Sequence, residues 1–300
     1  MTPPNRRQFL AGMAAGSTCL SAATAFSFLQ PQQPEFKKAL KLYMVGEGDS
    51  LLEKFQLVKD LGYDGIELDS PNGFKTDEIL AARDANGLDI HGVVDSAHWN
   101  QPFSHPDKKV RAQGVEAGRT AIRDAKAYGA TSVLIVPAVV EKTISYQDAW
   151  NRSQEEIAKL VPEAEAAGIQ IAFENVWNNF LLSPLEMAQY IDSFKSKVVG
   201  AYLDVGNLVR YAWPEHWVEV LSSRIFKIDV KEYSRKKQTE EGIWKGFAVD
   251  LHKGDCDWPT VVKALRKIGY RGWFTAEMIG GNKEHLAKIA KDMDFIFSSQ

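Results

Sequence analysis

The chain has 300 residues, of which 45% are hydrophobic and 25% are charged, and its formal net charge is −3. These values are ordinary for a soluble globular protein and allow one large α/β domain. Because the chain is not basic, we expect no nucleic-acid partner.

Residues 1–30 are predicted to form a leader peptide. Arg6-Arg7 precedes Phe9-Leu10, a small-residue apolar stretch covers residues 11–20, and Ala23-Thr24-Ala25 forms an A-x-A cleavage site. Adjacent arginines in this context resemble a bacterial twin-arginine export signal, which predicts a periplasmic or extracytoplasmic protein. The alternative is a cytoplasmic protein with a disordered tail. The apolar stretch is shorter than the roughly 20 residues of a spanning helix, so no stable membrane span is expected after cleavage.

Residues 37–300 are predicted to form one (β/α)8 TIM barrel, because strand-like runs alternate with amphipathic helical runs. The eight predicted strands cover residues 40–45, 65–69, 88–94, 132–137, 169–174, 199–204, 225–230 and 273–278. Predicted helices include residues 51–61, 110–128, 154–167, 184–194, 258–268 and 284–297. The stretch 233–257 is predicted to be an irregular loop over the barrel mouth. An open, doubly wound sheet is the alternative fold, but no glycine-rich phosphate loop follows the first strand.

An acidic residue ends each of four consecutive predicted strands. In residues 170–174, Ile171 and Phe173 alternate with Glu174, which therefore lies on the less apolar face at the C-terminal end of the strand. The next three strands carry Asp204, Asp229 and Glu277 at the same end. In the seventh strand, the sequence predicts one face with Phe226, Ile228 and Val230, and another with Lys227, Asp229 and Lys231.

Converging acids repel one another, and they must either bind protons or share a cation. A divalent ion bound by Glu174, Asp204, Asp229 and Glu277 is the simplest solution. Ligation by oxygen alone suits Mn²⁺, Mg²⁺ or Ca²⁺ better than Zn²⁺. Glu67, at the end of the second predicted strand, is expected at the same mouth of the barrel.

Several aromatic and histidine residues are candidates for binding a sugar. His98 and Trp99 follow the third strand, where an indole face and ring nitrogens suit a sugar, and Trp177 and Trp244 offer similar surfaces. Packing within loops is the alternative interpretation. His91 lies inside a strand and is predicted to be a core residue.

The chain resembles the xylose isomerase-like TIM barrels, known as sugar phosphate isomerases/epimerases, from about Leu40 to its end. The matching motifs are Gly62-Tyr63-Asp64-Gly65-Ile66-Glu67-Leu68, Glu174-Asn175, Leu203-Asp204-Val205-Gly206-Asn207, Lys231-Glu232, Gly254-Asp255-Cys256-Asp257-Trp258 and Gly269-Tyr270-Arg271-Gly272-Trp273 before Glu277. Each motif is short, but their order and spacing together are fairly specific.

The resemblance implies that Glu174, Asp204, the position of Asp229, and Glu277 hold a divalent metal, usually Mn²⁺. It further implies that the two glutamates act as acid and base. The chain departs from the family where Asp229-Val230-Lys231-Glu232 replaces the usual His-x-Lys-Asp. Lys227 and Lys231, on the same face, are expected to offset the extra negative charge of Asp229.

The resemblance also implies several substrate-binding positions. Asn207 stands where epimerases often present a substrate-binding histidine, and Arg235 matches an arginine that often follows the metal ligand. Together with Lys231, the remaining candidates for contacting the substrate are Glu67, His98, Trp99 and Trp177.

The favoured functional hypothesis is a metal-dependent isomerase or epimerase that acts on a keto sugar or related polyol through an enediolate. The first alternative is a lyase that uses the same proton abstraction on a 3-keto-glycoside and then expels the aglycone. The second is a non-catalytic sugar-binding barrel. The expected partner is a small carbohydrate, and a homo-oligomer is compatible with the sequence.

Overall fold

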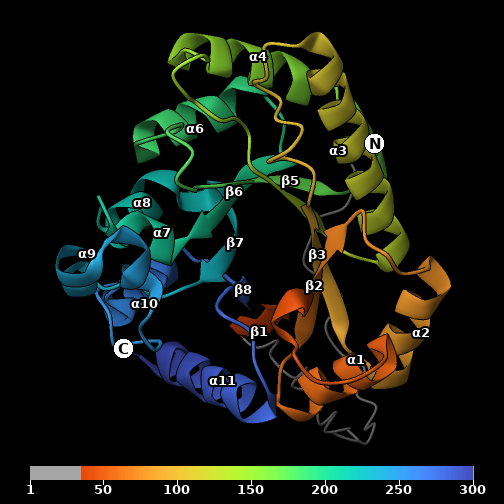
Figure 1. Cartoon of the computed structure of the whole chain (residues 1–300), viewed down its shortest axis with the longest axis vertical. Coiled ribbons are helices and arrows are strands. Elements are labelled where there is room, and N and C mark those ends of the chain that lie inside the picture. Colours follow the sequence, from red (N-terminus) through yellow and green to blue (C-terminus); the bar gives the residue numbers. More distant parts are fainter. Residues whose placement is uncertain (1–34, 300) are drawn as a thin grey trace, which may run out of the picture. The chain divides into compact units, whose positions relative to one another are not determined.

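The structure, a computed structural model, describes residues 35–299. In this part of the chain, eight parallel strands close into a barrel, and helices surround the ring of strands (Figure 1). The strands are β1 (Phe36–Lys41), β2 (Gly65–Ser70), β3 (Asp89–Asp95), β4 (Ser132–Ile135), β5 (Gln170–Glu174), β6 (Val199–Asp204), β7 (Ile225–Val230) and β8 (Gly272–Ala276). The helices are α1 (Leu51–Asp60), α2 (Thr76–Asn86), α3 (Lys108–Tyr128), α4 (Tyr146–Ala158), α5 (Val161–Ala167), α6 (Pro184–Ser193), α7 (Val205–Val209), α8 (Pro214–Leu221), α9 (Arg235–Glu241), α10 (Trp258–Lys267) and α11 (Lys283–Ser298).

Pairing of β1 with β8 closes the sheet, which confirms the predicted TIM barrel and excludes the open, doubly wound alternative. Outward-facing residues such as Ile171 and Phe173 of β5 join the apolar layer between the strands and the helices. Several glycines that follow helices adopt the left-handed conformation that ends a helix, for example Gly129 after α3, with φ 80°. The chain therefore uses the expected alternation to bury one face of each strand under helices.

The first strand begins and ends four residues earlier than predicted, at Phe36–Lys41 instead of 40–45. The lysines of this strand obscure its pattern, because a strand is recognised by apolar residues that alternate onto the buried face. Lys38 extends from the strand to Asp294 on α11, whereas Lys41 is buried at the C-terminal end. Residues Leu42–Met44 form a short 3₁₀ helix instead of a strand.

Two helical predictions were also wrong in detail. The segment 154–167 is divided into α4 and α5, because Pro162 lies in the first turn of α5 and cannot continue a preceding helix. The predicted irregular loop 233–257 contains α9 and the 3₁₀ helix Ile243–Phe247. Both short helices lie between β7 and α10.

The interior of the barrel is largely polar. Tyr202 on β6 donates hydrogen bonds to the carboxylate of Glu67 on β2, at 3.2 and 3.3 Å, across the centre of the barrel. Lys227 on β7 contacts Nδ1 and the carbonyl oxygen of His91 on β3. His91 is thus a buried and hydrogen-bonded core residue, as predicted. Phe226 packs inside the barrel near Tyr202, and not on the outer face as predicted, because the β6–β7 register shifts between Ala201 and Tyr202.

The predicted leader, with its Arg6-Arg7 pair, lies outside the described residues. Within residues 35–299, none of the helices combines the length and the apolar character needed to cross a membrane.

Candidate active site

Four carboxylates meet at the C-terminal end of the barrel. Glu174 and Asp204 end β5 and β6, Asp229 is the penultimate residue of β7, and Glu277 directly follows β8. One oxygen of each lies within 4.8 Å of an oxygen of every other. Asp204 and Asp229 pair in register, so their side chains point in the same direction from neighbouring strands. The structure thus brings together the four acids that the sequence predicts as metal ligands.

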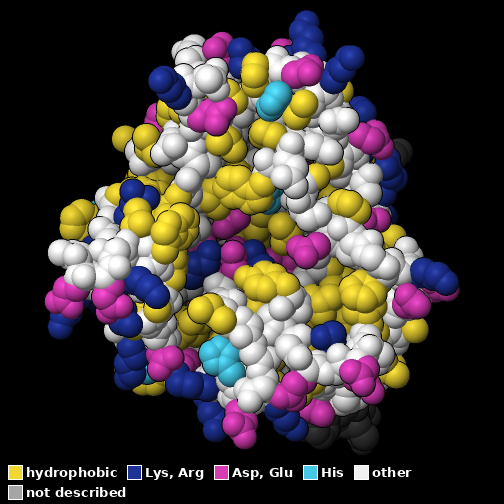
Figure 2. All heavy atoms as spheres, in the orientation of Figure 1, with side chains coloured by type: hydrophobic (Ala, Val, Ile, Leu, Met, Phe, Trp, Pro, Cys, Tyr) yellow, Lys and Arg dark blue, Asp and Glu magenta, His cyan; other side chains and the backbone are white. Residues whose placement is uncertain are grey.

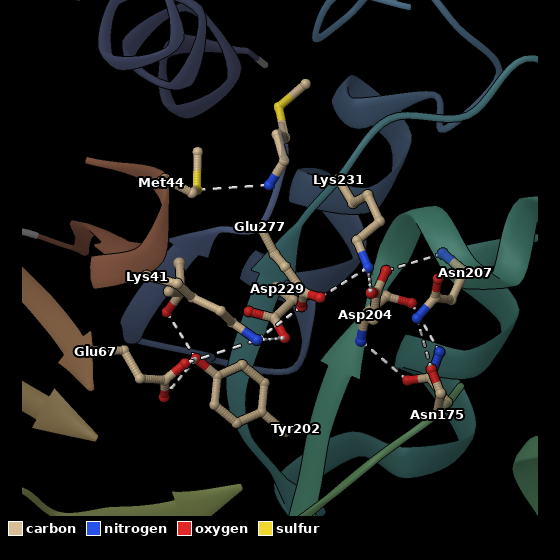
Figure 3. Close-up of polar contacts among 12 residues, drawn as sticks. Lys41, Met44, Glu67, Asn175, Tyr202, Asp204, Asn207, Asp229, Lys231 and Glu277 are labelled. Atoms are coloured by element: carbon tan, nitrogen blue, oxygen red, sulfur yellow. Dashed lines mark hydrogen bonds and ion pairs between the residues drawn. The ribbon is translucent and has the colours of Figure 1, made fainter. Parts of the chain in front are cut away.

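A buried lysine from the first strand lies against this cluster (Figure 3). Lys41 Nζ is 2.7 Å from Glu277 Oε2, 3.2 Å from Asp229 Oδ2 and 3.8 Å from Glu67 Oε2. The ammonium group therefore contacts carboxylates from three other strands. Lys41 was not among the residues predicted for the site.

A second lysine contacts the other side of the cluster. Lys231 Nζ is 2.8 Å from Asp204 Oδ2 and 3.1 Å from Glu277 Oε1, so each oxygen of Glu277 faces an ammonium group. As expected, Lys231 offsets part of the negative charge of the four acids, but the ion pair of Asp229 itself is formed with Lys41. Lys227 lies two residues deeper in the barrel, where its ammonium group contacts His91.

The electrostatic environment separates the two glutamates. Burial and the neighbouring Glu277 carboxylate raise the pKa of Glu174 to about 8. Burial also raises the pKa of Asp204, and raises that of Asp229 strongly. Burial would raise the pKa of Glu277 as well, but the Lys231 and Lys41 ammonium groups outweigh it and hold this pKa well below its usual range. Three of the four acids thus have a raised affinity for a proton.

The four acids fit a divalent cation. Among residues 35–299, Oδ1 of Asp229 is buried without a hydrogen-bond partner, and Oδ2 of Asp204 is buried with only the Lys231 ammonium group beside it, at 2.8 Å. Four carboxylates and two ammonium groups together leave a formal charge of −2, which a divalent ion would neutralise. Oxygen atoms at this spacing are the donors that hard ions prefer. Glu174, Asp204, Asp229 and Glu277 would hold the ion, with Lys41 and Lys231 beside them.

Two asparagines fix the position of Asp204. Asn175 donates from its amide to the carbonyl oxygen of Asp204 at 2.8 Å and accepts from the backbone N–H of Asp204 at 2.9 Å. The backbone N–H of Asn207 donates to Asp204 Oδ1 at 2.8 Å, and its amide donates to the carbonyl of Asn175 at 3.1 Å. This network explains why the Glu174-Asn175 and Asp204-to-Asn207 motifs occur together.

A cavity of about 970 Å³ opens above the acids. Figure 2 shows hydrophobic side chains around a central hollow, with acidic and basic side chains at its bottom. Glu174, Glu277 and Lys231 line the cavity, and the predicted substrate-binding residues Asn207, Trp99 and Trp177 also lie on its wall. Its volume is at the upper end of the roughly 300–1,000 Å³ typical of ligand pockets.

Three predicted substrate-binding residues do not line this cavity. Glu67 is buried below the acids, where it accepts hydrogen bonds from Tyr202. His98 is buried beside Trp99 and accepts from the N–H of Val136, and burial lowers its pKa to about 4. The Arg235 guanidinium donates to the carbonyl oxygens of residues 209 and 212, at 2.9 and 2.8 Å. Arg235 thus fixes the loop before α8.

The sequence prediction missed Lys41, Tyr43 and Phe247, of which the last two line the cavity. Lys41 could have been found if the first strand had been placed correctly, because it is then another charged residue at a strand's C-terminal end. For Phe247 no signal was available, since it lies in the stretch predicted to be irregular.

A barrel whose strand ends carry four acids defines a TIM-barrel protein with a candidate metal centre. The family model for xylose isomerase-like TIM barrels matches residues 55–298, and the chain belongs to this family. The chain is 27% identical over 268 residues to L-ribulose-5-phosphate 3-epimerase UlaE of Escherichia coli O1:K1, with 83% of this chain and 89% of the relative covered.

Two solved structures illustrate the shared fold. The first is 3-keto-D-glucoside 4-epimerase YcjR from E. coli, with a TM-score of 0.71, 14% identity, and 87% of this chain and 98% of that chain covered. The second is the IolI protein with a binding zinc atom, with a TM-score of 0.72, 18% identity and the same coverage. At these identities the likeness shows the fold alone.

Proposed function

We propose that the protein is a metal-dependent carbohydrate epimerase or isomerase that moves a proton on the carbon next to the carbonyl of a keto sugar. The observation that carries this proposal is the placement of Glu174 and Glu277 on the wall of one cavity, beside Asp204 and Asp229. The relationship to a ribulose-phosphate epimerase supports the same class of reaction.

The residues of the chain would divide the chemistry as follows. Glu174 and Glu277 come from β5 and β8, which are not adjacent, so a substrate carbon can lie between their carboxyl groups. One glutamate removes the proton, and the other returns a proton to the substrate. Lys41 and Lys231 fix the orientation of Glu277 through one ammonium group on each oxygen. A bound divalent ion would supply Lewis-acid polarisation of the carbonyl.

The ion is proposed to be Mn²⁺ or another hard divalent metal, because all four donors are carboxylates. Purified protein equilibrated with Mn²⁺ should retain about one ion per chain, and Asp204→Asn should lose it. Elemental analysis after gel filtration checks both. A wild-type protein that stays metal-free at millimolar Mn²⁺ would favour the alternative of a non-catalytic sugar-binding barrel. The close contacts of Lys41 and Lys231 with the carboxylates favour the same alternative.

The catalytic proposal is tested by incubating the protein with a panel of keto sugars and 3-keto-glycosides in D₂O. Deuterium should appear on the carbon next to the carbonyl in the epimer or isomer, because a carboxylic acid exchanges its proton with solvent. Glu277→Gln should keep the fold and reduce turnover by about two orders of magnitude or more. Glu155→Gln, an exposed glutamate on α4, is the matched control and should leave turnover unchanged.

A lyase acting on a 3-keto-glycoside is the second candidate, favoured by the room in the cavity for an aglycone. It shares the proton abstraction and differs in the release of the aglycone, which the same incubation detects. If sugars bind tightly with metal present but show neither labelling nor turnover, both enzymatic proposals are overturned.

A further inference from the structure

Exposed hydrophobic side chains gather at the cavity. Eleven large hydrophobic side chains are exposed among the described residues, and four of them line this one cavity: Tyr43, Trp99, Trp244 and Ile279. Exposed apolar surface that is gathered in a concave site marks ligand or partner binding, whereas isolated exposed residues need no explanation.

Three aromatic rings form one wall of the cavity. Trp177 lies 4.9 Å from Trp244 and 5.0 Å from Phe247, measured between ring centroids. Trp177 donates from Nε1 to the carbonyl oxygen of Asn207 at 2.8 Å, and the Arg210 guanidinium lies 4.8 Å from its ring centroid. These two contacts fix the position of the Trp177 ring, while Trp244 remains 70% exposed.

This wall is directly connected to the acidic centre. Trp177 follows Glu174 by three residues, and both line the same cavity, as do Trp244 and Phe247. A ligand whose reacting carbon lies at Glu174 and Glu277 would therefore extend along the aromatic wall.

The charged residues that line the cavity do not favour a phosphate group on the part of the ligand that lies along the aromatic wall. Among the described residues, the lining contains four acids, Glu174, Glu232, Asp250 and Glu277, against Lys231, Lys237 and Lys253, and no arginine. Lys231 already pairs with Asp204 and Glu277. A phosphate site would require a local excess of positive charge.

We infer that Trp177, Trp244 and Phe247 form a second subsite that binds a flat, uncharged ring joined to the reacting sugar. This inference rests on the proposed function, which places the reacting sugar at Glu174 and Glu277. It deepens that function, because it predicts that the substrate is a glycoside and not a free monosaccharide or a sugar phosphate. The ring is either an aryl group or a second pyranose, since both present a flat C–H or π face to an indole.

The test compares binding of unreactive probes by calorimetry, so that it does not depend on turnover. Phenyl and methyl β-glycosides of glucose, galactose and xylose are compared in pairs, together with cellobiose, lactose and xylobiose. We expect at least one ring-bearing probe to bind about tenfold more tightly than its methyl glycoside. Tighter binding of the phenyl glycosides alone would show that the subsite binds an aryl group, and tighter binding of the disaccharides would show that it binds a second sugar.

Trp244→Ala should remove most of this tenfold difference and leave the affinity for the methyl glycoside unchanged. Trp213→Ala is the matched control, because Trp213 is 55% exposed but lies beside Arg235 outside the cavity lining. The lysine variants Lys237→Met and Lys253→Met should leave the affinity for the ring-bearing probe unchanged.

Two outcomes overturn the inference. One is equal affinity, or no binding, for the ring-bearing and methyl probes throughout the panel. The other is tight binding of L-ribulose 5-phosphate that the lysine variants abolish and Trp244→Ala does not. Failure of the proposed function is seen separately, as ring-dependent binding without deuterium incorporation into any keto sugar.

Discussion

Lys41 contacts three carboxylates that come from three other strands: Glu67, Asp229 and Glu277. The Asp229 carboxylate is fully buried and lies 3.2 Å from the Lys41 ammonium group. Without this ammonium group, Asp229 would lose its ion pair, and a buried carboxylate left without its partner is strongly destabilising.

Lys41→Met should therefore lower the free energy of unfolding by about 3–5 kcal/mol in the presence of a chelator. Lys41→Met combined with Asp229→Asn should recover part of this loss, because the second change removes one unpaired charge. Urea denaturation measures both variants. Lys37→Met, on the same strand, breaks a partly exposed pair with Asp89 and a contact of the ammonium group with the Trp273 ring, and should cost at most about 2 kcal/mol. Equal losses for the two single variants would refute the role assigned to Lys41.

Asp95, a buried acid outside the cluster of four carboxylates, should make the free energy of unfolding depend on pH. Asp95 ends β3 and accepts from the N–H of Ala97 through Oδ1, whereas its buried Oδ2 has no hydrogen-bond partner within the described part of the chain. Burial raises the pKa of Asp95 to about 7. An unfolded aspartate has a pKa of about 3.9, so between these pH values the native state holds a proton that the unfolded state releases.

The free energy of unfolding contributed by Asp95 should therefore fall as pH rises from about 4 to about 7. Asp95→Asn removes the titration, so the variant should gain stability relative to wild type by up to about 4 kcal/mol at pH 8 and much less at pH 5. Urea denaturation at the two pH values checks this. A constant difference between Asp95→Asn and wild type would contradict the argument.

At the scale of single elements, an irregularity in strand pairing positions the buried Glu67. The β2–β3 register shifts between Ile66 and Glu67, so that Glu67 lies opposite Gly92. A side chain at Gly92 would lie 2.6 Å from Glu67 Oε1 and 3.0 Å from Lys227 Nζ. The glycine therefore leaves the space that the polar interior of the barrel occupies.

Gly92→Ala should destabilise the protein by about 1–3 kcal/mol, because the added methyl group overpacks a buried and hydrogen-bonded interior. Since Glu67 lies next to Lys41, catalytic turnover should also fall. Thermal denaturation and the proton-exchange assay measure the two effects. Gly73→Ala is the control, because its new methyl group would meet nothing within 4 Å. Similar stability of the two variants would show that the interior can adapt.

The elements show which features a single sequence reveals. Alternation located β5 and β6 to within one residue, because their outer residues, such as Phe173 and Leu203, are apolar and their final residues are acids. The same rule misplaced β1, because this strand contains Lys38, which forms an ion pair outside the barrel, and Lys41, which forms one inside it. Register shifts leave no periodic signal, so the inward position of Phe226 could not be predicted.

At the scale of the whole barrel, the acids could be predicted because a parallel barrel brings the C-terminal ends of all its strands together. The cavity wall could not be predicted, since Trp177 lies in the loop after β5 and Phe247 ends a 3₁₀ helix about 70 residues later in the chain. Only the folded chain places their rings 5.0 Å from each other. The four candidate ligands, spread from Glu174 to Glu277, likewise form a site only once the barrel has closed.

This dependence of the site on a closed barrel is consistent with the export route proposed for the protein. A twin-arginine signal carries proteins that have already folded, so the barrel would close and could acquire its metal before crossing the membrane. Changing Arg6 and Arg7 to lysine should leave the full-length precursor in the cytoplasm, because the signal depends on the arginine pair. Cell fractionation followed by immunoblotting measures the distribution. Arg123→Lys, a conservative change at an exposed position of α3, is the control and should leave export unchanged. If the double-lysine variant is delivered outside the cytoplasm as efficiently as wild type, the twin-arginine assignment is wrong.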